Sequence, residues 1–102
     1  LIYATNATGV WDQDVVDGNG NTGIFPVIEM DDNDDSFIAY FNTDNDNLMY
    51  ATNKSGIWKT TTIDKAATIG IQPGLAVDSN NTISIVCSGE YAVWYTSFAG
   101  GI

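Results

Sequence analysis

The chain has 102 residues, the size of one small domain or of a part of a larger one. Thirteen acidic residues face three lysines and no arginine, and the net charge of −10 argues against nucleic acid as a partner. Ten of the acids and no lysine lie in residues 1–47, whereas residues 48–102 are neutral overall.

Composition also limits the kinds of catalytic, metal-binding and disulfide chemistry that the chain can support. The absence of histidine removes the commonest general base and zinc ligand, and a single cysteine can form no internal disulfide. No apolar run reaches the roughly 20 residues that a membrane-spanning helix needs.

Taken in order along the chain, the segments show strand patterns from residue 1 onward. Helical periodicity is missing, whereas threonine, valine, isoleucine and tyrosine are abundant. Between the apolar segments lie runs of Asp, Asn, Ser and Gly, which favour turns. The predicted strands are residues 1–5, 26–31, 36–41, 48–52, 57–63, 73–78, 83–88 and 93–97.

The chain repeats itself at an offset of 47 residues. Leu-Ile-Tyr-Ala-Thr-Asn at 1–6 returns as Leu-Met-Tyr-Ala-Thr-Asn at 48–53, and the ungapped offset gives 14 identities in 47 positions. Composition alone would give roughly three, so the repeat is genuine. A third copy begins at Val93, two residues early. We therefore divide one domain into a first repeat at 1–47, a second at 48–92 and the start of a third at 93–102.

The length and pattern of the repeat predict an all-β fold built from β-propeller blades. Four short antiparallel strands in a unit of about 47 residues, each joined to the next by a hairpin, are typical of such a blade. A β-sandwich of similar strands is the alternative, although it leaves the repeat unexplained. Two blades cannot close a propeller, so we expect the chain to belong to a longer polypeptide or to assemble with copies of itself.

The motif Leu-x-Tyr-Ala-Thr-Asn-x-x-Gly-x-Trp, followed by a Pro-x-Ile/Leu-x-x-Asp segment, covers both full repeats. It resembles a bacterial extracellular repeat that occurs in tandem in secreted propellers. More loosely, it is similar to the Asp-box of sialidase-type propellers. The resemblance implies a six- to eight-bladed propeller at the cell surface or outside the cell, with blades used for binding or display.

Two classes of repeated or clustered residues have competing interpretations. Trp11 and Trp58 are suited to stacking on sugar rings, but their identical place in each repeat favours packing between neighbouring sheets. Acidic loops, including the run from Asp12 to Asp14, could supply oxygen ligands to calcium, and solvated turns are the alternative. A calcium ion in every blade is excluded because the second repeat lacks the corresponding acids.

Catalytic residues are not predicted. A glycosidase carboxyl needs an apolar pocket to remain protonated, and nearly all the acids lie in polar stretches. Glu29 and Glu90 are the exceptions. Glu29 is the unexpected one, and it either lines a central channel or faces solvent. Cys87 takes the place of Tyr40 in the second repeat and is interpreted as a small buried side chain.

The predicted ligand-binding residues lie in loops that differ between the repeats. In a propeller, the loops at 17–25, 42–47, 64–72 and 88–92 would share one face. Residues that vary there can specialise, whereas repeated residues hold the scaffold. The candidate ligand-binding residues are Phe25, Asp44, Gln72, Glu90 and Tyr91.

Three functions fit these patterns. The first is a non-catalytic extracellular propeller module for recognition, adhesion or surface assembly. The second is a carbohydrate-binding lectin formed by a ring of two-blade chains. The third is the propeller part of a secreted glycoside hydrolase whose catalytic residues lie elsewhere. The expected partners are other blades of the same or identical chains and a glycan or protein ligand. No cofactor is expected, with calcium as an open alternative.

Overall fold

The computed structural model describes residues 1–44, 47–64, 73–88 and 93–98, and within these ranges the chain is all-β. No helix that could span a membrane occurs in them. The strands are β1 (Ile2–Thr5), β2 (Asp12–Val15), β3 (Thr22–Met30), β4 (Ser36–Asn42), β5 (Asn47–Thr52), β6 (Lys59–Asp64), β7 (Gly74–Val77), β8 (Ile83–Ser88) and β9 (Val93–Phe98).

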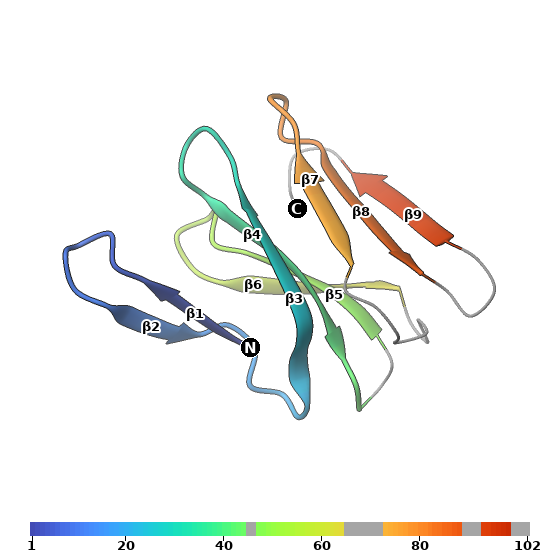
Figure 1. Cartoon of the computed structure of the whole chain (residues 1–102), viewed down its shortest axis with the longest axis horizontal. Coiled ribbons are helices and arrows are strands. Elements are labelled where there is room, and N and C mark those ends of the chain that lie inside the picture. The colour runs from blue at the N-terminus through green and yellow to red at the C-terminus, as the bar shows by residue number, and fades with distance from the viewer. Residues whose placement is uncertain (45–46, 65–72, 89–92, 99–102) are drawn as a thin grey trace.

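These strands form three antiparallel sheets that follow one another along the chain (Figure 1). The first is the β1–β2 hairpin, the second is the four-stranded sheet β3-β4-β5-β6, and the third is β7-β8-β9. The expected four-stranded antiparallel unit is therefore present. None of the three sheets closes on itself.

The four-stranded sheet takes strands from both full repeats. It runs from Thr22 to Asp64, so the sequence boundary at residues 47 and 48 lies at the start of β5. By the 47-residue offset, β5 and β6 correspond to β1 and β2, and β7 and β8 correspond to β3 and β4. The third copy keeps this register, since Tyr95 stands opposite Val86 as Tyr50 stands opposite Ala39.

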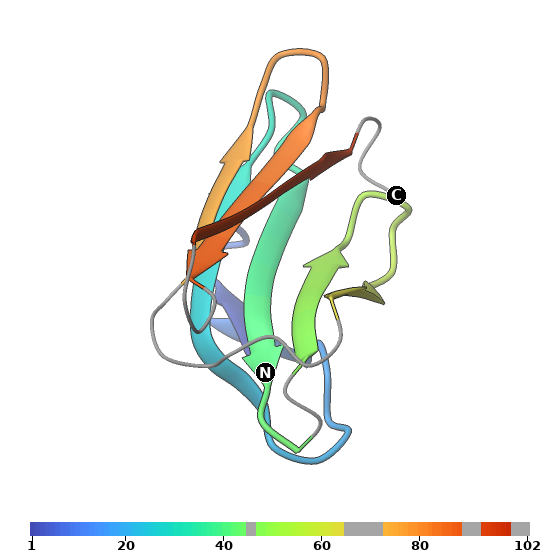
Figure 2. The ribbon, with the colours of Figure 1, turned by 90° about the vertical axis from the view of Figure 1, so that its right-hand side faces the viewer.

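The hydrophobic core lies on both faces of the middle sheet, and every residue of β4 is buried. One face packs on the third sheet and the other on the first hairpin, so the middle sheet lies between its neighbours (Figures 1 and 2). The buried cluster toward the third sheet comprises Phe37, Ala39, Phe41, Leu48, Tyr50, Leu75, Ile83, Ile85 and Cys87. The cluster toward the hairpin comprises Val16, Ile38, Tyr40, Met49 and Ala51, with Leu1, Tyr3 and Trp58 packed against it.

The repeated Thr-Asn-x-x-Gly motif forms the same hairpin turn in both copies. The amide of Gly9 donates to the carbonyl of Asn6, and that of Gly56 to the carbonyl of Asn53, each at 2.9 Å. Both glycines have a left-handed backbone, with φ of 97° and 99°, a conformation that side chains disfavour. Turn geometry therefore accounts for these repeated residues.

A second repeated turn joins β3 to β4 and β7 to β8. The Oδ1 atom of Asp31 accepts the amides of the residues two and four positions on, both at 2.9 Å. That of Asp78 does the same at 2.9 and 2.8 Å. An aspartate that bonds to its own following backbone is a standard way to fix a turn. The carboxylates of Asp31 and Asp78 therefore have a structural role in these turns.

Candidate functional site

The loops before β3 and after β4 meet at one end of the middle sheet. The side-chain amide of Asn21 donates to Oδ1 of Asp44 at 2.8 Å, and its backbone amide donates to Oδ2 at 3.0 Å. The amide of Thr43 in turn donates to the carbonyl of Asn21 at 2.9 Å. Two of the four loops predicted to share one end therefore do so.

Phe25 gives this end of the sheet an aromatic side chain with an unusual backbone. Its φ of 51° lies in the left-handed region, although it precedes Pro26, which disfavours helical conformations. The cause is an irregularity in β3, whose register against β4 shifts between Ile24 and Val27. The side chain is 43% exposed, so its ring can contact a ligand.

The predicted ligand-binding residues divide into three groups. Phe25 is exposed and open to contact. Asp44 is exposed as well, but both of its carboxylate oxygens accept hydrogen bonds from Asn21, so it holds the two loops together. Gln72, Glu90 and Tyr91 lie outside the described residues.

A buried polar pair lies behind this end and was not anticipated from the sequence. The hydroxyl of Tyr40 donates to Oδ2 of Asp17 at 2.8 Å, and both residues are buried. Burial, followed by the hydrogen bond to Asp17, raises the pKa of Tyr40 far above its usual value. Asp17 also accepts the amide of Asn19 through Oδ1, which fixes the start of the loop. The repeat gave no signal for this pair, because Asp17 recurs as Asp64 whereas Tyr40 is replaced by Cys87.

The acidic residues are placed differently from one another. Asp12 and Asp14, expected in a loop, lie instead in β2, where all four residues are exposed. A strand with no buried side chain tolerates carboxylates. The loop prediction was wrong here because it rested on the acidic composition of the segment. Glu29 is exposed on β3. Within the described ranges, no three His, Cys, Asp or Glu side chains come together where they could hold a metal ion.

The two repeated tryptophans differ in the structure, because Trp58 packs on the neighbouring sheet as predicted whereas Trp11 is exposed, so the packing prediction is wrong for Trp11. The rings of Trp58, which directly precedes β6, and of Tyr3 on β1 have centroids 5.0 Å apart and are tilted by 56°. This confirms the packing interpretation for Trp58. Trp11, at the same place in the first repeat, is 70% exposed. Cys87 is 4% exposed, in agreement with its interpretation as a buried side chain.

Comparisons with protein-family models, with curated proteins and with solved structures find no match for this chain.

Proposed function

We propose that the chain is a non-catalytic blade module of an extracellular β-propeller, and that its loops serve recognition, adhesion or surface assembly. One observation carries the proposal: the two junctions between sheets use the same repeat positions in the same direction. Leu1 and Tyr3 pack toward the middle sheet as their counterparts Leu48 and Tyr50 pack toward the third sheet.

The receiving faces correspond too. Ile38 receives the first hairpin, and its counterpart Ile85 receives the middle sheet. Contacts that join one face of a unit to the opposite face of the next unit are heterologous. A series of such contacts forms a ring when the rotation from each unit to the next closes a full circle. A ring of four-stranded sheets stacked face to face is a propeller.

Four of the described acids have structural roles. Asp17 bonds to Tyr40, Asp31 and Asp78 fix turns, and Asp44 joins two loops. A carboxyl group that acts as an acid or nucleophile must instead face an open site. Among the residues at the loop end that differ between the repeats, Phe25 is an exposed aromatic residue, which is suited to contact with a sugar ring or an apolar side chain.

A glycan-binding screen of the 102-residue chain tests this proposal. We expect at least one glycan to bind without being cleaved, and we expect Phe25→Asn to weaken that binding about tenfold or more. Asparagine tolerates the left-handed backbone, so the variant should remain folded. Met30→Asn is the matched control, because Met30 is 49% exposed on the same strand but at its other end.

Each other outcome argues against the proposal. Equal loss of binding in both variants would place the ligand away from the loop end. Cleavage of the glycan would show an enzyme. A chain that binds nothing, tested against glycans and against surface proteins of bacteria, would remove recognition as its role.

A further inference from the structure

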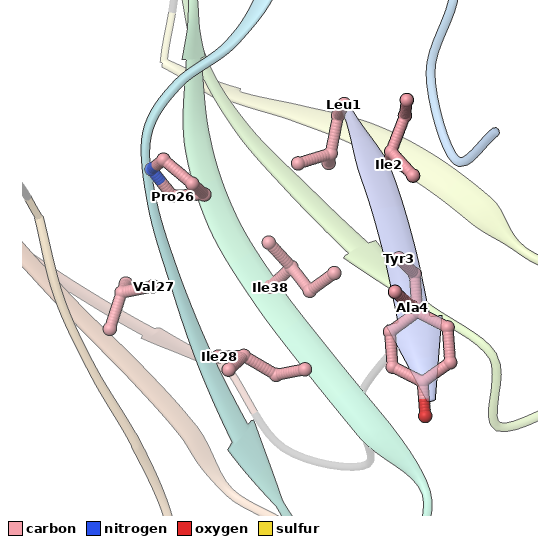
Figure 3. A pocket seen from close by; sticks show the side chains of 8 residues that line it. All are labelled: Leu1, Ile2, Tyr3, Ala4, Pro26, Val27, Ile28 and Ile38. Atoms are coloured by element: carbon pink, nitrogen blue, oxygen red, sulfur yellow. The ribbon is translucent and has the colours of Figure 1, made fainter. Parts of the chain in front are cut away.

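An apolar groove of about 240 Å³ runs between β1 and the middle sheet (Figure 3). One wall is the start of the first strand, and the other is β3 with one side chain of β4. Ile28 projects on this side and is 48% exposed. The lining residues are Leu1, Ile2, Tyr3, Ala4, Pro26, Val27, Ile28 and Ile38.

The strand that forms one wall of this groove has an open edge. Within the described residues, β1 pairs only with β2. Its counterpart β5 pairs with β6 on one side and with β4 on the other. An open edge offers unpaired amides and carbonyls to an incoming strand.

The second repeat shows which side chains fill the position equivalent to this groove. Leu75, the counterpart of Ile28, is 9% exposed, because it packs in a cluster with side chains of β4. In that cluster, Phe37 and Phe41 are fully buried, and Phe37 stacks on Tyr50 with ring centroids 6.3 Å apart. One junction is therefore filled by an inner strand, and the corresponding groove beside β1 is open.

We propose that the groove beside β1 is the docking site for an inner hairpin from a further unit of this repeat. That partner is a two-stranded hairpin with the chemistry of β3–β4, and it adds to β1 as an antiparallel strand. The register of β4 on β5 places Phe37 opposite Thr52, Ala39 opposite Tyr50 and Phe41 opposite Leu48. In the docked hairpin, aromatic residues therefore stand opposite Thr5 and Leu1, with a small residue opposite Tyr3. This inference rests on the repeat alone and holds whether or not the loops bind a ligand.

The test uses a synthetic peptide of residues 22–42, which carries β3 and β4, added to the full 102-residue chain. Binding is measured by fluorescence anisotropy of the labelled peptide, and hydrogen–deuterium exchange reports on residues Ile2–Thr5. We expect saturable binding and slower exchange in this strand. A peptide with Phe37→Ser and Phe41→Ser should bind about tenfold more weakly, because it lacks the aromatic residues that fill the groove.

Two substitutions in the chain locate the site. Ile28→Asp places a charge in the groove and should weaken peptide binding about tenfold or more. Ile57→Asp adds the same charge in the turn before β6, at 67% exposure and outside the groove lining, and should change binding by less than about twofold. Neither residue is buried, so both variants should fold.

Three results would overturn the proposal. The first is a peptide that does not bind, or that binds equally well with serines in place of both phenylalanines. The second is equal weakening by the two aspartates. The third is a chain that is already oligomeric with Ile2–Thr5 protected and that the peptide does not dissociate, since a surface other than an inner hairpin would then occupy the groove.

Discussion

The two junctions between sheets use equivalent positions but differ in how completely they bury them. At the second junction, Phe37, Phe41 and Tyr50 are fully buried under the third sheet. At the first, Leu1 and Tyr3 are only half-buried, because the hairpin that carries them has two strands. Burial at a repeat position is therefore set by the extent of the neighbouring sheet as well as by the residue.

The junctions also differ in chemistry at one shared position. Tyr40 of the middle sheet faces the first hairpin and donates a hydrogen bond to buried Asp17, whereas its counterpart Cys87 lies in an apolar cluster. The direction of packing is therefore the same at both junctions, whereas the residues that form the contacts differ. A polar pair joins the first junction, and close aromatic packing joins the second.

The largest expected effect is at the second junction. Phe37→Ala removes a ring that is fully buried and stacked on Tyr50, so we expect a loss of about 3–5 kcal/mol in the free energy of unfolding. Urea unfolding followed by circular dichroism measures the loss, and a transition that disappears altogether agrees with it. Ile28→Ala is the control, because a half-exposed side chain should cost about 1 kcal/mol. Equal losses of unfolding free energy in Phe37→Ala and Ile28→Ala would contradict the difference in burial between the two side chains.

The next effect belongs to the buried polar pair of the first junction. Tyr40→Phe leaves the Asp17 carboxylate without its hydroxyl donor, and we expect a loss of about 1.5–3 kcal/mol. Adding Asp17→Asn to that variant should cost less than the sum of the two single substitutions, because the two residues act as a pair. Strict additivity in urea unfolding would contradict a direct hydrogen bond.

The same pair gives this prediction a pH dependence. Burial raises the pKa of Tyr40 far above its ordinary 10.0, and burial raises that of Tyr50 to about 12. The folded chain then keeps protons that the unfolded chain releases near pH 10, so the free energy of unfolding falls as the pH rises above that value. Tyr40→Phe should make this fall shallower. An unchanged slope would show that Tyr40 does not titrate differently in the two states.

The structure could be predicted from the sequence best where the conformation of a segment depends on its own residues and local hydrogen bonds. The strand pattern and the repeat predicted most of the strands. The Thr-Asn-x-x-Gly motif and the polar runs between apolar segments marked turns that form through local hydrogen bonds. The Tyr40–Asp17 bond spans 23 residues and depends on how one sheet docks on another. The left-handed backbone of Phe25 depends on a shift in strand pairing. Neither can be derived from a local pattern.

The smallest expected effect tests whether the two ends of the molecule unfold together. Gly9 and Gly56 occupy the same turn with φ near 100°, and no other atom lies within 4 Å of an added Cβ at either position. Alanine there introduces backbone strain alone, about 1–2 kcal/mol at each site. Gly56→Ala strains a hairpin of the four-stranded sheet and should lower the global free energy of unfolding by that amount.

Gly9→Ala strains a two-stranded hairpin that is covered on one side only, and such hairpins open locally at lower cost than a core sheet. Its effect should therefore appear mainly as faster hydrogen exchange in Ile2–Thr5, with less than about half the global loss of Gly56→Ala. If the two variants lower the global free energy equally, the hairpin unfolds with the rest of the chain. The incomplete burial of Leu1 and Tyr3 would then carry no energetic difference between the junctions.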